Sequence, residues 1–386
     1  MPASRFGERT YGKLEKDMMA LYLLLGGAML FLWGRFYRGC WLRNLFVKVS
    51  FEKDFVYCGE QVQMTEVIEN RKRIPLPVVE IGFRIQKGVR FVDVENTTVS
   101  DFIYKRDVFS VLGWESITRK YQVECEKRGH YRITQQVLET HSLFFRREYR
   151  LEEDTDTELY VYAGKRDISR IMKSCESILG DVISRNKVYE DPFAFASIRE
   201  YTPLDPMKTI NWKASARTGN LMVNTFSSVC SRQFMIYLDV WDRGILKADE
   251  LVEEGIAVAA SLLRSLVRQG LETGLCVNAG DSGAERRGIT LFPPEKGQSH
   301  LSGIERFLTE NFDRLEKTSF EDMVKEVPAD RIPVFITREY HEELENLLRD
   351  CLPREFPGIQ VVICGKENKT APRQEGMLKI LPWRTV

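Results

Sequence analysis

Two aspartates stand just beyond a predicted buried strand, where carboxylates are able to hold a metal ion. Asp239 and Asp242 follow the continuous apolar run Phe234–Leu238, which is typical of a strand buried on both faces. A second such run, Ile332–Ile336, is followed by Thr337–Glu339. Because ligands of parallel sheets bind beyond the carboxyl ends of the strands, these two places are where a binding site is expected first.

The side chains around these aspartates do not favour a cation, which needs converging oxygen ligands. Trp241 and Arg243 alternate with the aspartates, and Arg338 follows the second strand. We therefore expect no metal and no cofactor. One interpretation is that the Arg338 guanidinium replaces the cation and pairs with Asp239 or Asp242. The other is that both arginines point into solvent.

Segment 199–223 gathers charged, hydroxyl and aromatic residues that offer either a binding surface or a set of structural contacts. The candidates are Arg199, Glu200, Tyr201, Asp205, Trp212, Lys213, Ser215 and Arg217. The pattern predicts a helix that Asp205 caps, with Pro206 at its first position and Gly219 at its end. Because tryptophan is usually well buried, the structural interpretation is favoured: Trp212 packs, and Arg199 or Arg217 ties a loop to a strand.

The elements that must position these residues alternate between strands and helices over residues 164–386. This rhythm predicts a mainly parallel sheet with helices on both faces. Gly270 follows a helical pattern that ends at Arg268, where a left-handed cap belongs. The expected strands are 234–238, 273–277, 332–336 and 359–364, and the expected helices are 248–268, 301–310 and 341–352.

Residues 45–163 show a different pattern, with apolar and polar residues alternating in short runs. Period two is the signature of half-buried strands, and turn residues separate the runs. Several antiparallel strands without a convincing helix predict an all-β, sandwich-like module. The expected strands begin at Leu45 and continue at 61–69, 78–85, 89–94, 119–126, 131–139 and 158–162.

A hydrophobic segment comes before both regions. Residues 18–33 carry no charge, and extension to residue 37 gives a length that can span a bilayer. We expect a tail at 1–17 and a transmembrane or membrane-anchoring helix at 18–37, passing once through the membrane. Positive residues flank the segment almost symmetrically, so they do not orient it. The scattered cysteines favour a body on the cytoplasmic side.

Composition narrows the classes of function. The chain has 56 basic and 56 acidic residues, so its net charge gives no basic footprint for nucleic acid. None of the eight cysteines forms a C-x-x-C pair, and only four histidines are present, without an H-E-x-x-H motif. No glycine-rich phosphate-binding motif follows a strand.

The run Arg199–Asp205, followed by Ile210–Gly219 and Leu221–Val223, resembles the hallmark of a bacterial family, domain of unknown function 58. More loosely, Glu69–Pro77 and Lys127–Arg132 resemble its β region. The resemblance implies a von Willebrand A-like α/β fold (a Rossmann-like parallel sheet), hydrophobic segments near the amino end, and association with MoxR-type AAA+ ATPases.

The same resemblance bears on the metal. Active von Willebrand A domains bind a divalent cation through Asp-x-Ser-x-Ser and a further Asp. Here Trp241 and Arg243 stand at the serine positions, and Arg338 stands at the position of the later aspartate. The resemblance therefore implies a degenerate metal site.

Three functions remain open. The first is a non-enzymatic interaction or scaffold protein in the bacterial cytoplasmic membrane, with a MoxR-type AAA+ ATPase as the partner implied by the resemblance. The alternative is an adhesion-like domain that binds its ligand through a cation. The third is a hydrolase, for which the sequence offers no nucleophile–base pair and no G-x-S-x-G motif.

Overall fold

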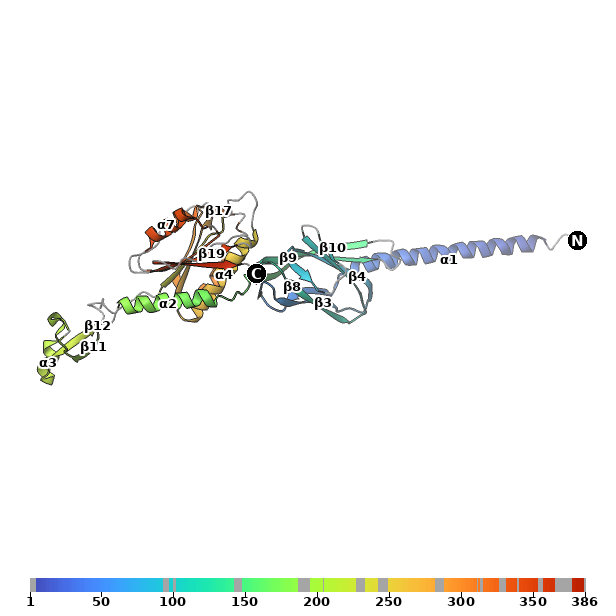
Figure 1. The fold of residues 1–386 in the computed structure, drawn as a ribbon. Coiled ribbons are helices and arrows are strands. Elements are labelled where there is room, and N and C mark those ends of the chain that lie inside the picture. Colours follow the sequence, from blue (N-terminus) through green and yellow to red (C-terminus); the bar gives the residue numbers. More distant parts are fainter. Residues whose placement is uncertain are drawn as a thin grey trace. The chain divides into compact units, whose positions relative to one another are not determined.

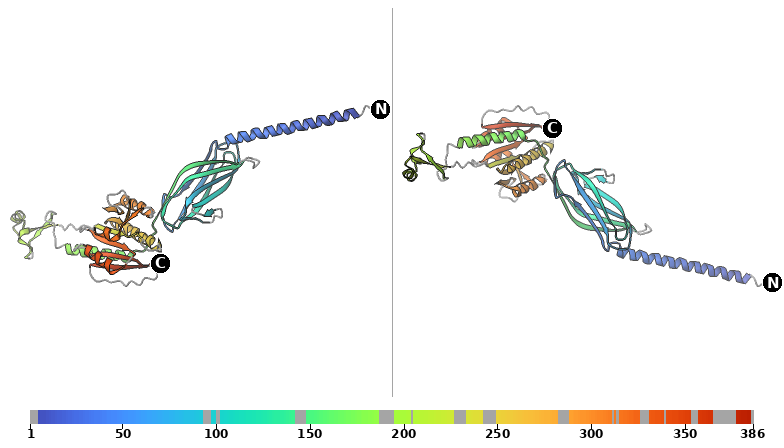
Figure 2. Two further views of the ribbon diagram at one scale, coloured as in Figure 1. Left: turned by 90° about the horizontal axis from the view of Figure 1, so that it is seen from above. Right: turned by 90° about the horizontal axis from the view of Figure 1, so that it is seen from below.

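The chain forms two compact units, unit 1 (Met1–Val161) and unit 2 (Tyr162–Val386). Figure 1 labels their helices and strands, and Figure 2 shows the same ribbon from two further sides. The computed structural model describes residues 5–92, 97–99, 102–141, 148–186, 195–203, 205–226, 233–241, 249–281, 288–310, 312, 315–325, 331–338, 340–352, 357–364 and 377–384.

Unit 1 opens with one long helix, α1 (Arg5–Cys40). Its part from Met18 to Cys40 spans 23 residues with a mean hydropathy of 1.5, and its most apolar stretch is not buried against the rest of the protein. Leu24, for example, is 72% exposed. By length and composition this helix is able to cross a membrane, as the uncharged segment predicts, although a signal sequence has the same character.

Strands make up the remainder of unit 1, in two antiparallel sheets with the orders β1-β3-β8-β5 and β2-β10-β9-β4-β7-β6. The bounds are β1 (Leu45–Phe51), β2 (Phe55–Tyr57), β3 (Gln61–Asn70), β4 (Leu76–Gln86), β5 (Val89–Phe91), β6 (Thr97–Val99), β7 (Phe102–Val111), β8 (Ser116–Cys125), β9 (Gly129–His141) and β10 (Glu148–Tyr162).

The two sheets enclose an apolar interior. Along β3 every second side chain is buried, which confirms the period-two pattern of residues 61–69. Met64 of β3 and Phe83 of β4 belong to one buried cluster, so the two sheets pack face to face. Full burial of a side chain of this size contributes roughly 1.5–3 kcal/mol, and this packing is the main stabilising force of the unit.

The carboxyl end of α1 packs into a second cluster of the same unit. Tyr37 and Trp41 are only 2% and 3% exposed, and they lie among apolar residues of β3, β4, β7 and β9 that include Ile68. The Lys72 ammonium donates a 2.7 Å hydrogen bond to the carbonyl oxygen of Trp41. The end of the helix is therefore fixed to the sheets by both packing and a charge-assisted hydrogen bond.

A charged cluster interrupts the apolar interior of unit 1. Lys105 and Asp107 of β7 point inward, are 1% and 5% exposed, and form an ion pair. The Lys105 Nζ lies 3.6 Å from the centre of the Tyr121 ring, and the Tyr121 hydroxyl donates to the fully buried Glu66. Burial lowers the pKa of Lys105 to about 8 and raises the pKa of Glu66.

Unit 2 contains a six-stranded sheet in the order β16-β14-β13-β18-β19-β20 and two small ladders, β11–β12 and β15–β17. The helices are α2 (Ser169–Asn186), η1 (Met207–Thr209), α3 (Trp212–Thr218), α4 (Asp249–Arg268), α5 (Gln298–Thr309), α6 (Phe320–Val324) and α7 (Glu342–Cys351). The strands are β11 (Phe195–Glu200), β12 (Met222–Phe226), β13 (Gln233–Leu238), β14 (Glu272–Val277), β15 (Ala279–Gly280), β16 (Thr290–Glu295), β17 (Glu316–Lys317), β18 (Ile332–Thr337), β19 (Gly358–Cys364) and β20 (Leu378–Arg384).

The predicted fold class, a von Willebrand A-like α/β domain with a Rossmann-like parallel sheet, was wrong. The six-stranded sheet is mixed, because β16 pairs antiparallel with β14 while the other neighbours are parallel. The chain as a whole is dominated by strands, most of them antiparallel in unit 1. β16 returns beside β14 without a crossover helix among the described residues, and such a return produces an antiparallel neighbour.

Helices cover both faces of this mixed sheet. Ile236 of β13 lies in a cluster with residues of α2, α4 and α5, whereas its neighbour Tyr237 lies in a cluster with residues of α6 and α7. Successive side chains of a strand point to opposite faces, so β13 contributes to both clusters. Gly270 has a φ of 75° beyond the end of α4, which confirms the predicted left-handed cap.

One ion pair is buried between the helices of unit 2. The Arg264 side chain of α4 and the Glu305 side chain of α5 are 6% and 4% exposed, with 2.8 Å between Nε and Oε1. A second guanidinium nitrogen of Arg264 donates to the carbonyl oxygen of Ala163 at 2.7 Å. Arg264 thus links two helices and the first residues of the unit.

Candidate functional site

The segment that the sequence singled out folds as a small ladder with a helical connection, here called the β11–β12 module (residues 195–226). β11 and β12 pair antiparallel, and η1 and α3 lie between them in the chain. Ile210 and Val223 form a bridge and are only 7% and 1% exposed. The module therefore has a very small interior, and most of its side chains face outward.

The strongest contact in the module joins Arg199 of β11 to Asp205. Two guanidinium nitrogens of Arg199 donate to the two carboxylate oxygens of Asp205, at 2.7 and 2.5 Å. Such a bidentate pair is directional as well as charged. The predicted role of Arg199, tying a loop to a strand, is confirmed.

Asp205 does not cap a helix, so this prediction was wrong. Its carboxylate also accepts hydrogen bonds from the backbone N–H and the hydroxyl of Thr202, both at 2.8 Å. The residue before η1 is Pro206, which has no side-chain capping bond. With four donors already facing it, the Asp205 carboxylate closes the loop behind it. Those donors hold its pKa well below the usual range, the Arg199 guanidinium being the largest cause.

The helix α3 is capped by a residue that the sequence reasoning missed. The Asn211 side chain accepts a 2.9 Å hydrogen bond from the Ala214 N–H and donates to Asn224 of β12 at 2.7 Å. Asparagine is among the preferred capping residues, so its place directly before Trp212 was an available signal. At the other end, Gly219 has a φ of 79°, which confirms the predicted helix end.

The remaining small contacts hold α3 against the ladder. The Ser215 hydroxyl donates to the carbonyl oxygen of Asn211 and accepts from the N–H of Met222, both at 2.8 Å. Tyr201 is partly buried, and its N–H donates to the carbonyl oxygen of Leu221. Glu200 is exposed at the end of β11. Ser215 and Tyr201 thus have structural contacts rather than free functional groups.

The outward side of the module carries large apolar side chains. Trp212 is 66% exposed and Met207 is 72% exposed, while Leu221 is 46% exposed. The expectation that Trp212 packs was therefore wrong. Lys213 and Arg217 are exposed too, and their spacing of four places them on one face of α3. Arg217 accordingly makes no described tie to a strand, and an apolar patch with basic neighbours results.

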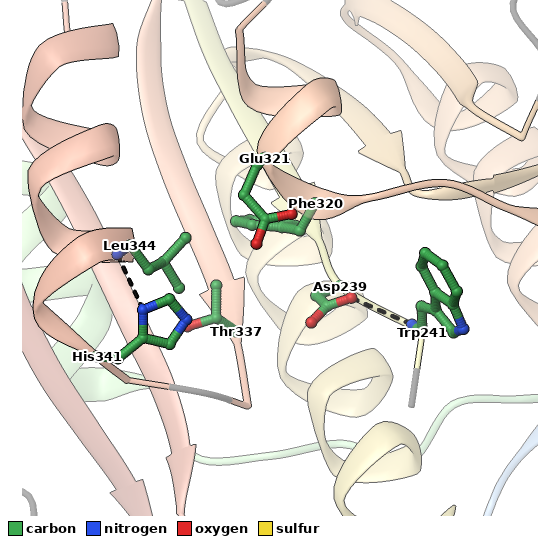
Figure 3. Close-up of a pocket in the computed structure, with 7 residues that line it drawn as sticks. All are labelled: Asp239, Trp241, Phe320, Glu321, Thr337, His341 and Leu344. Atoms are coloured by element: carbon green, nitrogen blue, oxygen red, sulfur yellow. Dashed lines mark hydrogen bonds between the residues drawn. The ribbon is translucent and has the colours of Figure 1, made fainter. Parts of the chain in front are cut away.

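The second predicted region forms a pocket beyond the ends of β13 and β18. Asp239, Trp241 and Thr337 line it together with the amino ends of α6 and α7, including Glu321 and His341, and it holds about 350 Å³ of empty space. Figure 3 shows these side chains around the pocket. The structure thus brings Asp239 and Thr337 together at the carboxyl ends of neighbouring parallel strands, where a site was expected.

Most of the polar atoms in this pocket already have partners. The Asp239 carboxylate accepts from the Asn278 amide at 2.7 Å and from the Trp241 N–H at 3.1 Å. His341 is the amino-terminal cap of α7, and its Nδ1 accepts from the Leu344 N–H at 3.0 Å (Figure 3). The acidic and imidazole groups are therefore positioned by structural hydrogen bonds.

The Arg338 guanidinium reaches the same pocket edge. It donates to the carbonyl oxygen of Trp241, a backbone contact that the sequence reasoning did not foresee. Asp242 and Arg243 lie outside the described residues, so pairing of Arg338 with Asp242 is outside them as well. Among the described residues, no cluster of three or more His, Cys, Asp or Glu side chains could hold a metal ion.

Sequence comparison connects the module to a known family. Residues 197–333 match the family described as protein of unknown function DUF58. The resemblance stated from Arg199–Val223 is confirmed for this part of the chain, which holds the β11–β12 module and both strands of the pocket. The von Willebrand A-like description has no support in the comparisons.

One curated relative is the uncharacterized protein YeaD of Bacillus subtilis (strain 168), which is 22% identical over 311 residues, 79% of this chain and 73% of YeaD. Among solved structures, the CARDB domain of the PF1109 protein of Pyrococcus furiosus matches with a TM-score of 0.20 and 15% identity. A non-cellulosomal cohesin of Archaeoglobus fulgidus matches with a TM-score of 0.20 and 10% identity. Each covers 30% of this chain and 90% of the matched structure.

Removal of the Asp205 charge tests the loop closure in the module. We expect Asp205→Asn to speed hydrogen exchange at the Thr202 amide severalfold, because Asn lacks the second carboxylate oxygen that Arg199 uses. Because the pKa of Asp205 is lowered, the wild-type protection is complete above the ordinary aspartate pKa and is lost as pH falls toward the lowered value. Exchange measured by NMR or mass spectrometry checks both, and equal rates in Asp205→Asn and wild type would contradict the closure.

Proposed function

We propose that the protein is a non-enzymatic interaction protein, anchored in the bacterial cytoplasmic membrane by α1, whose β11–β12 module binds a MoxR-type AAA+ ATPase. The observation that carries the proposal is the exposure of Trp212, which is 66%, on a module held rigid by the Arg199–Asp205 pair. Tryptophan dominates the energetics of protein interfaces when a partner covers it.

The chemistry of the patch defines the partner surface. Met207 and Leu221 supply further exposed apolar area, and Lys208, Lys213 and Arg217 supply positive charge. A complementary partner presents an apolar pocket bordered by acidic residues, because charge complementarity speeds association and fixes register. The ATPase as partner comes from the family resemblance, and the match of residues 197–333 supports that choice of family.

The membrane anchor rests on α1. Its apolar part is long enough to cross a bilayer, and its carboxyl end is packed into the sheets of unit 1. A membrane helix that is fixed to a folded unit holds that unit at the bilayer surface. The body is proposed to lie on the cytoplasmic side, where an AAA+ ATPase has its nucleotide.

The test is affinity purification of the tagged full-length protein from detergent-treated membranes. We expect a MoxR-type ATPase to co-purify, and we expect Trp212→Ala to weaken its binding at least tenfold, since truncation of a central interface tryptophan costs about 2 kcal/mol or more. Quantitative mass spectrometry and binding of the purified pair measure the effect.

The matched control is Trp114→Ala, which removes a tryptophan of similar exposure (69%) from unit 1. We expect it to leave ATPase binding unchanged. Equal loss in both variants, or no ATPase in the wild-type sample, would refute the proposal. Binding that requires Mg²⁺ and disappears in Asp239→Ala would instead favour the cation-dependent, adhesion-like alternative.

A further inference from the structure

The connection between β7 and β8 exposes two large apolar side chains. Leu112 is 63% exposed and Trp114 is 69% exposed, and only Gly113 separates them. We call this segment the Leu112–Trp114 turn. Single exposed apolar residues are ordinary, but two adjacent ones on a turn form a surface that is unfavourable in water.

The backbone of this turn is firmly held. Trp114 has a φ of 64°, a conformation that bulky residues rarely adopt. Its N–H donates to the carbonyl oxygen of Lys72 at 3.1 Å, and the Asn70 amide donates to the carbonyl oxygen of Leu112 at 2.8 Å. A Cβ on Gly113 would lie 2.5 Å from the carbonyl oxygen of Arg73. The two side chains are thus presented by a turn that is fixed from several sides.

The same residues connect the turn to the end of α1. Lys72, whose carbonyl accepts from Trp114, uses its ammonium to bond the carbonyl oxygen of Trp41 at 2.7 Å. The neighbouring Arg71 N–H donates to the carbonyl oxygen of Asn44 at 2.8 Å. The Leu112–Trp114 turn therefore lies at the end of unit 1 from which α1 departs.

The length of the helix sets how far this end lies from the hydrocarbon. The uncharged run of α1 ends at Trp33, and a rise of 1.5 Å per residue puts Trp41 about 12 Å further along the axis. Each headgroup layer is roughly 5–8 Å thick. Because Tyr37 is already packed into the sheets, unit 1 begins within the depth of the headgroups.

We propose that the Leu112–Trp114 turn inserts into the headgroup region of the same bilayer that α1 crosses and acts as its second membrane contact. Tryptophan prefers this interface, where its ring is buried and its N–H finds polar partners. Arg43 and Arg73 are exposed beside it and complement anionic lipid headgroups. This inference rests on the proposed membrane anchoring and not on the ATPase.

The experiment uses the full chain reconstituted in vesicles of phosphatidylethanolamine and phosphatidylglycerol with brominated acyl chains, which quench nearby tryptophan fluorescence. The contribution of Trp114 is the difference between wild type and Trp114→Phe. We expect this contribution to be quenched more strongly by bromine near the headgroups than by bromine at the bilayer centre. Trp212→Phe, which removes an equally exposed tryptophan of unit 2, is expected to reveal no quenched contribution.

Resistance to alkaline extraction separates the two ideas. If the protein stays in the vesicles and the Trp114 contribution is unquenched, the inference is wrong and the anchor stands. If alkali releases the wild-type protein, the anchor fails and this inference fails with it. As a second variant, Leu112→Glu should reduce the quenching of Trp114 while the protein remains resistant to extraction, because a carboxylate resists entry into the interface.

Discussion

Replacement of Arg264 by leucine is expected to lower the free energy of unfolding of unit 2 by about 3–5 kcal/mol, because it leaves Glu305 charged and buried without its partner. The carbonyl oxygen of Ala163 loses its donor in the same variant. Burial already raises the pKa of Glu305, against the opposing effect of Arg264, so little else compensates the carboxylate.

Urea unfolding of the full-length protein in detergent, with hydrogen exchange of α4 as the probe of unit 2, measures this effect. Arg170→Leu removes an exposed arginine of α2 and should change stability by no more than about 0.5 kcal/mol. The double variant Arg264→Leu with Glu305→Leu should recover much of the loss, because no charge remains buried. Equal stability of Arg264→Leu and Arg170→Leu would contradict the buried ion pair.

Replacement of Lys105 by methionine is expected to destabilise unit 1 by a similar amount, about 3–5 kcal/mol. The ammonium pairs with Asp107 and lies over the Tyr121 ring, while Glu66 is fully buried nearby. Without it, two acidic groups remain in the interior with less compensating charge. Lys120→Met, which changes an exposed lysine of β8, is the matched control and should be nearly neutral.

Lys105 also makes the stability of unit 1 depend on pH. Burial lowers its pKa to about 8, while an unfolded lysine keeps its proton up to about pH 10.4. Between these values the unfolded chain binds more protons, so the wild-type stability should rise with pH in that window. Urea midpoints across this window check the slope, and Lys105→Met should lose it. An identical slope in both proteins would show that Lys105 is not its source.

Local sequence rules predicted the helices and strands of unit 2 well. The apolar run 234–238 is β13, and the left-handed caps at Gly219 and Gly270 are where the sequence places them. These features depend on a few neighbouring residues, since an apolar run seeks burial and glycine alone tolerates a positive φ at no cost.

Features that depend on distant parts of the chain were missed. β7 was not predicted, because its inward positions include Lys105 and Asp107 while Val108 faces outward, which inverts the usual alternation. The antiparallel position of β16 is set by its return beside β14 and not by its own residues. Composition alone could not show which strands would be neighbours.

The candidate site was predicted in place but not in detail. The Arg199–Asp205 pair was anticipated only as a loop contact, and Asp205 was assigned to a helix that Asn211 caps instead. Trp212 was expected to be buried because tryptophan usually is. In the β11–β12 module only Ile210 and Val223 are strongly buried, so no interior is large enough to take it.

The order of strands in the two sheet systems has a consequence for how the chain is made on the ribosome. Unit 1 is one continuous stretch, so all its strands are available once Val161 has emerged. In unit 2, β20 joins the edge of a sheet whose first strands were synthesised long before, and Trp383 of β20 reaches back to Glu254 of α4 with a 2.9 Å hydrogen bond. Until then, β19 exposes an unpaired edge that other chains can join. Nascent chains that stall before β20 are therefore the form most prone to aggregation.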